Sequence, residues 1–120
     1  MSTLQTEHRE INGVKVEITR VGDGRIRRVT YPGGFRWSKD MKPTVKTDSC
    51  EHTHVGYIVE GSIEITYADG CRAEFTAPQA VVIDAGHDGR VTGNGAAVMI
   101  EFDFEGETAR RFGLPESHRH

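Results

Sequence analysis

The sequence has no long hydrophobic run and little excess charge, and both absences narrow the class of protein. No apolar stretch in its 120 residues approaches the roughly 20 residues that a membrane-spanning helix needs. The formal net charge is only −3, and the arginines come in small local groups, so we expect no nucleic-acid partner. The first ten residues contain no apolar signal segment, and cysteines occur only at Cys50 and Cys71. We therefore expect a cytoplasmic protein with two free thiols and no membrane contact.

The sequence also lacks the short motifs that mark several large enzyme classes. It contains no nucleophile elbow, phosphate-binding glycine loop, zinc-finger spacing or dinucleotide fingerprint. Gly22-Asp23-Gly24 is not such a fingerprint, because a third glycine and a following helix are missing. These absences leave the catalytic residues, if there are any, unassigned.

Helix signals are nearly absent, whereas turn signals are frequent. The one convincing helix is Glu107 to Phe112, which Gly113 and then Pro115 terminate. Asn-Gly or Asp-Gly pairs recur at positions 12–13, 23–24, 69–70, 88–89 and 94–95, with segments of alternating polarity between them. Short strands separated by such turns predict a single all-β domain, either a sandwich or a barrel.

The last predicted strand, Ala96 to Phe104, alternates cleanly. Val98, Ile100, Phe102 and Phe104 occupy one face, and Met99, Glu101 and Asp103 occupy the other. We expect the apolar residues to face the core and the two carboxylates to face solvent. On that expectation the strand carries no paired-carboxylate site.

The densest chemistry lies between Cys50 and Gly61. If this stretch is a strand, then Cys50, His52 and His54 share one face, because side chains alternate along a strand. A further histidine, His87, follows Gly86 in a predicted turn. Imidazole and thiolate groups are ligands that transition metals prefer, so these residues are candidates for a metal site. The alternatives are a polar stripe of histidines, a turn histidine bonded to backbone or carboxylate, and buried cysteines that only fill space.

Several segments also occur in a recognisable order between residues 30 and 105: Phe35–Ser38, Asp48–Cys50, His54–Gly61, Ala68–Gly70 and Gly86–Gly89. Together they resemble a small single-domain cupin of the RmlC-like group, in particular a subgroup with a Gly-His-Asp turn. The resemblance implies a jelly-roll barrel, also called a double-stranded β-helix, made of two packed antiparallel sheets. It also implies a homodimer and a small-molecule ligand. Under it the chain divides into an N-terminal arm over 1–12, the barrel over 13–105, and a short C-terminal helix and tail over 106–120.

The match departs from the usual cupin ligand motifs. His54 stands where the family has a glutamate, and Cys50 falls at about the place of the second histidine of the usual His-x-His pair. The histidine expected three residues after Gly89 is missing, and His87 is the nearest replacement. The resemblance therefore implies a modified site of His52, His54 and His87 for a divalent transition metal, either zinc, nickel, iron, manganese or copper. Cys50 is an additional candidate ligand.

Two hypotheses about function follow. The first is a metal-binding cupin that acts on a small organic acid or carbonyl compound, with no reaction assigned by the resemblance. The second is a non-enzymatic cupin that binds a small molecule without metal, with the histidines as hydrogen-bond partners. A third, purely interaction role would use a barrel edge to form a dimer around a filled pocket. Trp37, the single tryptophan, either packs at the core or barrel mouth or stacks on a ligand.

Overall fold

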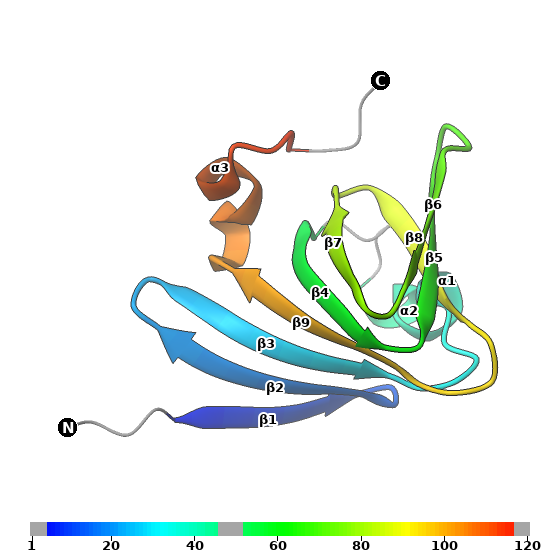
Figure 1. Ribbon diagram of the computed structural model, residues 1–120, viewed down its shortest axis with the longest axis horizontal. Helices are drawn as coiled ribbons and strands as arrows, with labels where there is room; N and C mark the ends of the chain where they lie inside the picture. Colours follow the sequence, from blue (N-terminus) through cyan, green and yellow to red (C-terminus); the bar gives the residue numbers. More distant parts are fainter. Residues whose placement is uncertain (1–4, 46–51, 117–120) are drawn as a thin grey trace.

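The computed structural model describes residues 5–45 and 52–116, and in these ranges the chain is mostly β-strand (Figure 1). The strands are β1 (Thr6–Ile11), β2 (Val14–Val21), β3 (Gly24–Tyr31), β4 (His54–Glu60), β5 (Ser62–Tyr67), β6 (Arg72–Thr76), β7 (Gln79–Ile83), β8 (His87–Thr92) and β9 (Ala97–Asp103). The helical turns are α1 (Trp37–Asp40), α2 (Lys42–Val45), η1 (Glu105–Glu107) and α3 (Thr108–Phe112). No helix in these ranges has the length and apolar character needed to cross a bilayer.

The strands form two antiparallel sheets. One has the order β1-β2-β3-β9-β4-β7 and the other the order β6-β5-β8. In Figure 1 the second sheet stands across from the β4–β7 end of the first, while β1 and β2 continue away from it. The last strand, β9, lies between β3 and β4 and so joins the beginning and the middle of the chain. This crossed order confirms the predicted all-β jelly roll.

Turn chemistry explains where the first strands reverse. Asn12 and Gly13 both have positive φ, 51° and 87°, as a tight hairpin turn requires, and Ile11 pairs with Val14 across it. The predicted C-terminal helix is confirmed as α3. It ends where Gly113 adopts φ 72° and its N–H reaches the carbonyl oxygens of Ala109 and Arg110.

Two helical turns between β3 and β4 were not predicted, since the sequence showed one convincing helix, at the C-terminal end. They are α1 and α2, each four residues long. Trp37 anchors α1 by its burial, and Pro43 is tolerated near the start of α2, where its missing N–H has no intrahelical partner to lose. Segments this short carry no repeating polarity, and therefore the sequence pattern did not reveal them.

The core lies between the inner faces of the two sheets. Its buried members include Val14, Val16 and Ile18 of β2, which alternate with polar residues as predicted for a half-buried strand. Ile83 of β7 and Met99 of β9 belong to the same sheet as β2, and Ile63 and Ile65 of β5 complete the core from the opposite sheet. This apolar packing fixes the inner face of each strand.

The predicted facing of β9 is wrong. Glu101 and Asp103 are buried, with 2% and 7% of their surface exposed, whereas Phe102 is 44% exposed. The two carboxylates are placed inside because β3 pairs Arg27 with Glu101 and Arg25 with Asp103 in the ladder. Buried charges are tolerated when an opposite charge and hydrogen bonds accompany them. Polarity alone therefore gave the wrong face.

Candidate functional site

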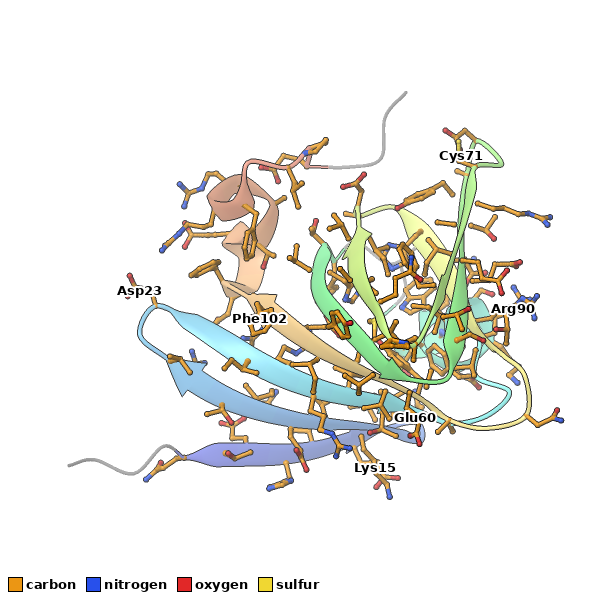
Figure 2. All side chains as sticks on the ribbon, viewed as in Figure 1. Lys15, Asp23, Glu60, Cys71, Arg90 and Phe102 are labelled. Atoms are coloured by element: carbon orange, nitrogen blue, oxygen red, sulfur yellow. The ribbon has the colours of Figure 1, made fainter. Side chains whose placement is uncertain are left out.

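An apolar cavity of about 360 Å³ lies inside the barrel. Its walls are mainly aliphatic and aromatic, with Val16 and Val29 on one sheet, Ile63 and Ile65 on the other, and Trp37 at the beginning of α1. Few polar side chains face it. They include His52, His54, His87, Arg27 and Arg90, and in Figure 2 Arg90 lies at the side of the barrel beside α1.

Among the predicted residues, His54 is the most firmly held. It is the first residue of β4 and is 9% exposed. Its Nδ1 lies 2.5 Å from Oε1 of Glu101 on the neighbouring strand β9, so the ring donates to a buried carboxylate. This bond fixes the ring and directs the other nitrogen, Nε2, to the opposite side of the imidazole.

His87 approaches the cavity from the second sheet. It begins β8, is 4% exposed, and places Nδ1 2.8 Å from the carbonyl oxygen of Asp84. The backbone bond of the predicted alternative is therefore present, but the predicted turn is wrong, because His87 and the Asp88-Gly89 pair lie on strand β8. That bond still leaves the ring facing the site, because the centroids of the His54 and His87 rings are 5.2 Å apart.

His52 reaches the same cavity but is less constrained. The strand does not extend back to it as we expected, since β4 begins only at His54. His52 is exposed, and its ring lies 6.4 Å from that of His54, centroid to centroid. Within residues 5–45 and 52–116, no three His, Cys, Asp or Glu side chains lie close enough together to enclose an ion.

The other two candidates have different outcomes. Trp37 is buried and lines the cavity, which is compatible with both its packing and its ligand-contact interpretation. Cys50 falls outside the described residues. The second cysteine, Cys71, is half-buried at the tip of the β5–β6 turn and does not line the cavity (Figure 2).

Sequence reasoning missed a network of buried charges beside His54. Arg25 donates two hydrogen bonds to Asp103, of 2.7 and 2.9 Å. Arg27 lies further from its acidic neighbours, with Nη1 3.5 Å from Oδ2 of Asp103 and 3.7 Å from Oε1 of Glu101. A usable signal was present: charges recur at alternate positions in both Arg25–Arg27 and Glu101–Asp103, as two facing ladder partners would show.

The network sets the charge of its acids. Burial by itself would raise the pKa of Glu101, but the electrostatic interaction and hydrogen bond with His54, together with the charge of Arg27, bring that pKa below its ordinary value. Burial opposes ionisation of Asp103 in the same way, and the hydrogen bonds and charge of Arg25, with Arg27, hold its pKa below the usual range. Both carboxylates are therefore ionised at neutral pH.

A second cavity of about 350 Å³ adjoins the first and is mostly polar. Its lining comes from β3, β9, the residues before β4 and the C-terminal segment, with Asp103, Glu105 and Thr108 among its members. Arg27 and His52 line both cavities. These two side chains therefore stand between the apolar interior and a polar vestibule.

Comparison with known proteins supports the fold. No protein-family model and no curated protein matches the sequence. Among solved structures, a Cupin 2 conserved barrel domain protein from Salinispora arenicola superposes with a TM-score of 0.59 and 15% identity, covering 89% of this chain and 88% of that one. An RmlC-like cupin from Shewanella frigidimarina gives a TM-score of 0.51 and 19% identity over 92% and 90% of the two chains.

A third match is a protein from Thermotoga maritima described as a predicted oxalate decarboxylase. It superposes with a TM-score of 0.51 and 17% identity, over 82% of this chain and 90% of that chain. The chain thus has the fold of a small RmlC-like cupin, as the sequence segments had indicated. At such identities the likeness concerns the fold, because one fold serves many reactions.

Proposed function

We propose that the chain is a small cupin of the subgroup with a Gly-His-Asp turn, and that it holds a divalent transition metal in its barrel through His54 and His87. His52 and Cys50 are the candidates for a further ligand. The occupied site binds a small organic acid or carbonyl compound in the apolar cavity. Zinc, nickel, iron, manganese and copper all accept imidazole ligands.

The observation that carries this proposal is the way the two rings are held. A histidine that binds a metal nearly always donates its other ring N–H to a carboxylate or a backbone carbonyl. His54 donates to Glu101, and His87 donates to the carbonyl oxygen of Asp84. Two imidazoles that share a tetrahedral ion have centroids roughly 5 Å apart, given metal–nitrogen distances of about 2 Å. The observed separation is 5.2 Å.

The protein's own contribution is to orient the metal-binding histidines and to surround the site with apolar side chains. Glu101 fixes the orientation of His54, and the aliphatic walls with Trp37 give the cavity a mainly apolar lining. A bound ion would act as a Lewis acid on a ligand oxygen. Low solvent access strengthens every electrostatic interaction in such a site.

One observation favours a second candidate function, a small-molecule-binding cupin without metal. The cavity walls are mainly apolar, and the described residues do not bring a third donor close to His54 and His87. In that case the imidazoles would bond a ligand directly.

Metal content distinguishes the two candidates. The parent for this test carries His118→Ala and His120→Ala, so that tail histidines cannot bind metal, and is purified without chelator. By elemental analysis we expect the parent to hold about one equivalent of a transition metal. We expect the double variant His54→Ala/His87→Ala to hold none. The matched control is His8→Ala, which removes an exposed histidine of β1. Equal metal in parent and double variant contradicts the proposal. A metal-free parent, even after soaking, supports the second candidate.

A homodimer in the cytoplasm completes the proposal. Large apolar side chains lie exposed on the outer face of the six-stranded sheet, where Ile26 neighbours Phe102 across the β3–β9 ladder. Tyr57 of β4 neighbours Ile100 of β9 on the same face, and exposed Val82 belongs to the next strand, β7. Contiguous exposed apolar surface of this kind marks an interaction site. We infer that a second copy of the chain covers it.

Light scattering coupled to size exclusion tests the dimer. Tyr57→Glu places a charge in the centre of this outer face and should shift the mass toward that of the monomer. Lys15→Glu changes charge on the same sheet, on β2, away from these residues, and should leave the mass unchanged (Figure 2). A parent that is monomeric at all concentrations overturns the inference.

A further inference from the structure

We propose that the ligand of the apolar cavity is a small organic anion, a carboxylic acid with an apolar body about the size of one ring, and that Arg27 binds its carboxylate. This assignment rests on the proposed function in placing the ligand in the same cavity. It does not depend on the identity of the metal.

The sign of the ligand's charge follows from the lining. Every strongly ionisable side chain that lines the apolar cavity is basic: Arg27, Arg90, His52, His54 and His87. Asp and Glu are not among the residues that line it in the described part of the chain. A cleft with charges of one sign and low-dielectric walls attracts ligands of the opposite sign. The cavity therefore favours an anion over a cation.

Arg27 is the basic group with the most hydrogen-bonding capacity left. The neighbouring acids make their closest contacts elsewhere: Oε1 of Glu101 lies 2.5 Å from Nδ1 of His54, and Oδ1 of Asp103 lies 2.7 Å from Nε of Arg25. The shortest polar contact of Arg27 is 3.5 Å, and its buried Nε has no hydrogen-bond partner among the described residues. A guanidinium carries five N–H donors and matches a carboxylate in a two-point geometry.

Arg90 is less suitable for this role. Its Nε donates to Glu64 at 3.1 Å, so one side of its guanidinium is occupied by a carboxylate of β5. Its side chain is 38% exposed, whereas that of Arg27 is 18% exposed. A charge contact is stronger where solvent is scarcer, and this comparison selects Arg27.

The body of the ligand follows from the rest of the cavity. A volume of about 360 Å³ is near the lower end of the range for ligand pockets, roughly 300 to 1,000 Å³. Trp37, Phe35 and the aliphatic residues of both sheets offer apolar contact but few hydrogen bonds. Because Arg27 and His52 stand between this interior and the polar vestibule, the ligand lies with its apolar body inward and its carboxylate toward them.

The test uses three probes that separate charge from apolar contact: phenylacetate, phenylacetamide and acetate. Phenylacetamide has nearly the same shape without the charge, and acetate has the charge without the ring. By isothermal titration calorimetry on the full chain, we expect phenylacetate to bind at least about tenfold more tightly than either. Equal affinity for phenylacetate and phenylacetamide overturns the proposal, and so does the absence of phenylacetate binding.

Variants then assign the charge to one residue. Arg27→Gln should remove the preference for the acid over the amide. Arg28→Gln, one position along the same strand on its exposed face, should preserve that preference. An acid preference that persists in Arg27→Gln overturns the assignment. If Arg27→Gln does not fold, Arg27→Lys decides. It retains the charge but loses the two-point geometry and should weaken phenylacetate binding about threefold or more. Unchanged affinity in Arg27→Lys contradicts the role.

Elemental analysis of the same samples keeps this test separate from the metal test. If the protein holds metal but shows no preference for the acid, the proposal of an anionic ligand is refuted and the metal proposal stands. If the protein holds no metal but prefers the acid in a way that depends on Arg27, the metal proposal is refuted and the proposal of an anionic ligand stands.

Discussion

Two cavities of nearly equal volume, about 360 and 350 Å³, adjoin each other at Arg27 and His52, yet their linings differ in chemistry. The barrel cavity is apolar with basic groups alone, whereas the vestibule mixes Arg25 with the carboxylates of Asp103 and Glu105. Volume therefore does not distinguish a ligand site from a solvent-filled recess here. Charge of one sign against apolar walls makes the barrel cavity the better candidate.

The barrel cavity has its His54 on β4, whose close approach to β9 holds it against Glu101, and disturbing that approach should have the largest effect. Gly56 pairs with Glu101, and a Cβ at Gly56 would overlap the carbonyl oxygen of Ile100. Gly56→Ala should thus force the two strands apart and cost about 3 kcal/mol or more in unfolding free energy.

Urea unfolding measures the cost of Gly56→Ala. The matched control is Gly95→Ala, where the added Cβ meets nothing within 4 Å, and its change should stay within about 0.5 kcal/mol. If the Gly56→Ala protein is as stable as its parent, the two strands can separate without loss of stability. The close contact between β4 and β9 would then not be important for the barrel.

The next test compares the two buried carboxylates of β9. Glu101 supports a histidine of the barrel cavity, and Asp103 belongs to the vestibule. Glu101→Gln removes the charge opposite His54 and Arg27, which should lower the unfolding free energy by about 2–3 kcal/mol and metal affinity by about tenfold or more. Competition with a chromophoric chelator reports the affinity.

Asp103→Asn is the counterpart, and its effect should be smaller and confined to stability. It should cost about 1–2 kcal/mol at pH 7 and leave metal affinity unchanged. Equal losses of metal affinity in the two variants would remove the distinction between the cavities, because the acids would then be serving one common site.

The smallest expected effect is the pH dependence of that same carboxylate. Arg25 and Arg27 hold the pKa of Asp103 below its ordinary value in the folded protein, despite burial. Its contribution to stability is therefore present above the unfolded pKa of about 3.9 and is lost as pH falls through the lower folded value. The stability difference between parent and Asp103→Asn should shrink below about pH 4, as urea unfolding at several pH values would show. A difference that stays constant to pH 2 contradicts this.

The sequence predicted the fold better than the site. The turn at Asn12-Gly13 and the helix before Gly113 were correct because each depends on a local conformation that few residues adopt. The facing of β9 was wrong because both of its faces contain apolar residues. Only pairing with Arg25 and Arg27 determines which face lies inside.

The sequence predicted which histidines line the cavity but not which residues hold them in place. His54 and His87 line the cavity, and their role as metal ligands stays a prediction. Glu101 was missed because its role depends on a contact between positions 54 and 101 that no local pattern contains. The assumption of a single strand through His52 was also incorrect, since β4 begins at His54.

Adjacent arginines on β3 have consequences for how this protein tolerates insertions and deletions. Arg27 faces the cavity, and Arg28 faces outward. One residue added or removed within β3 would exchange the two faces and carry Ile26 or Arg28 into the place of Arg27. Substitution at position 27 can thus retune ligand preference, whereas changes of length are better tolerated in the turns. Attempts to diversify this barrel should vary side chains within β3 and confine insertions to Gly22–Asp23.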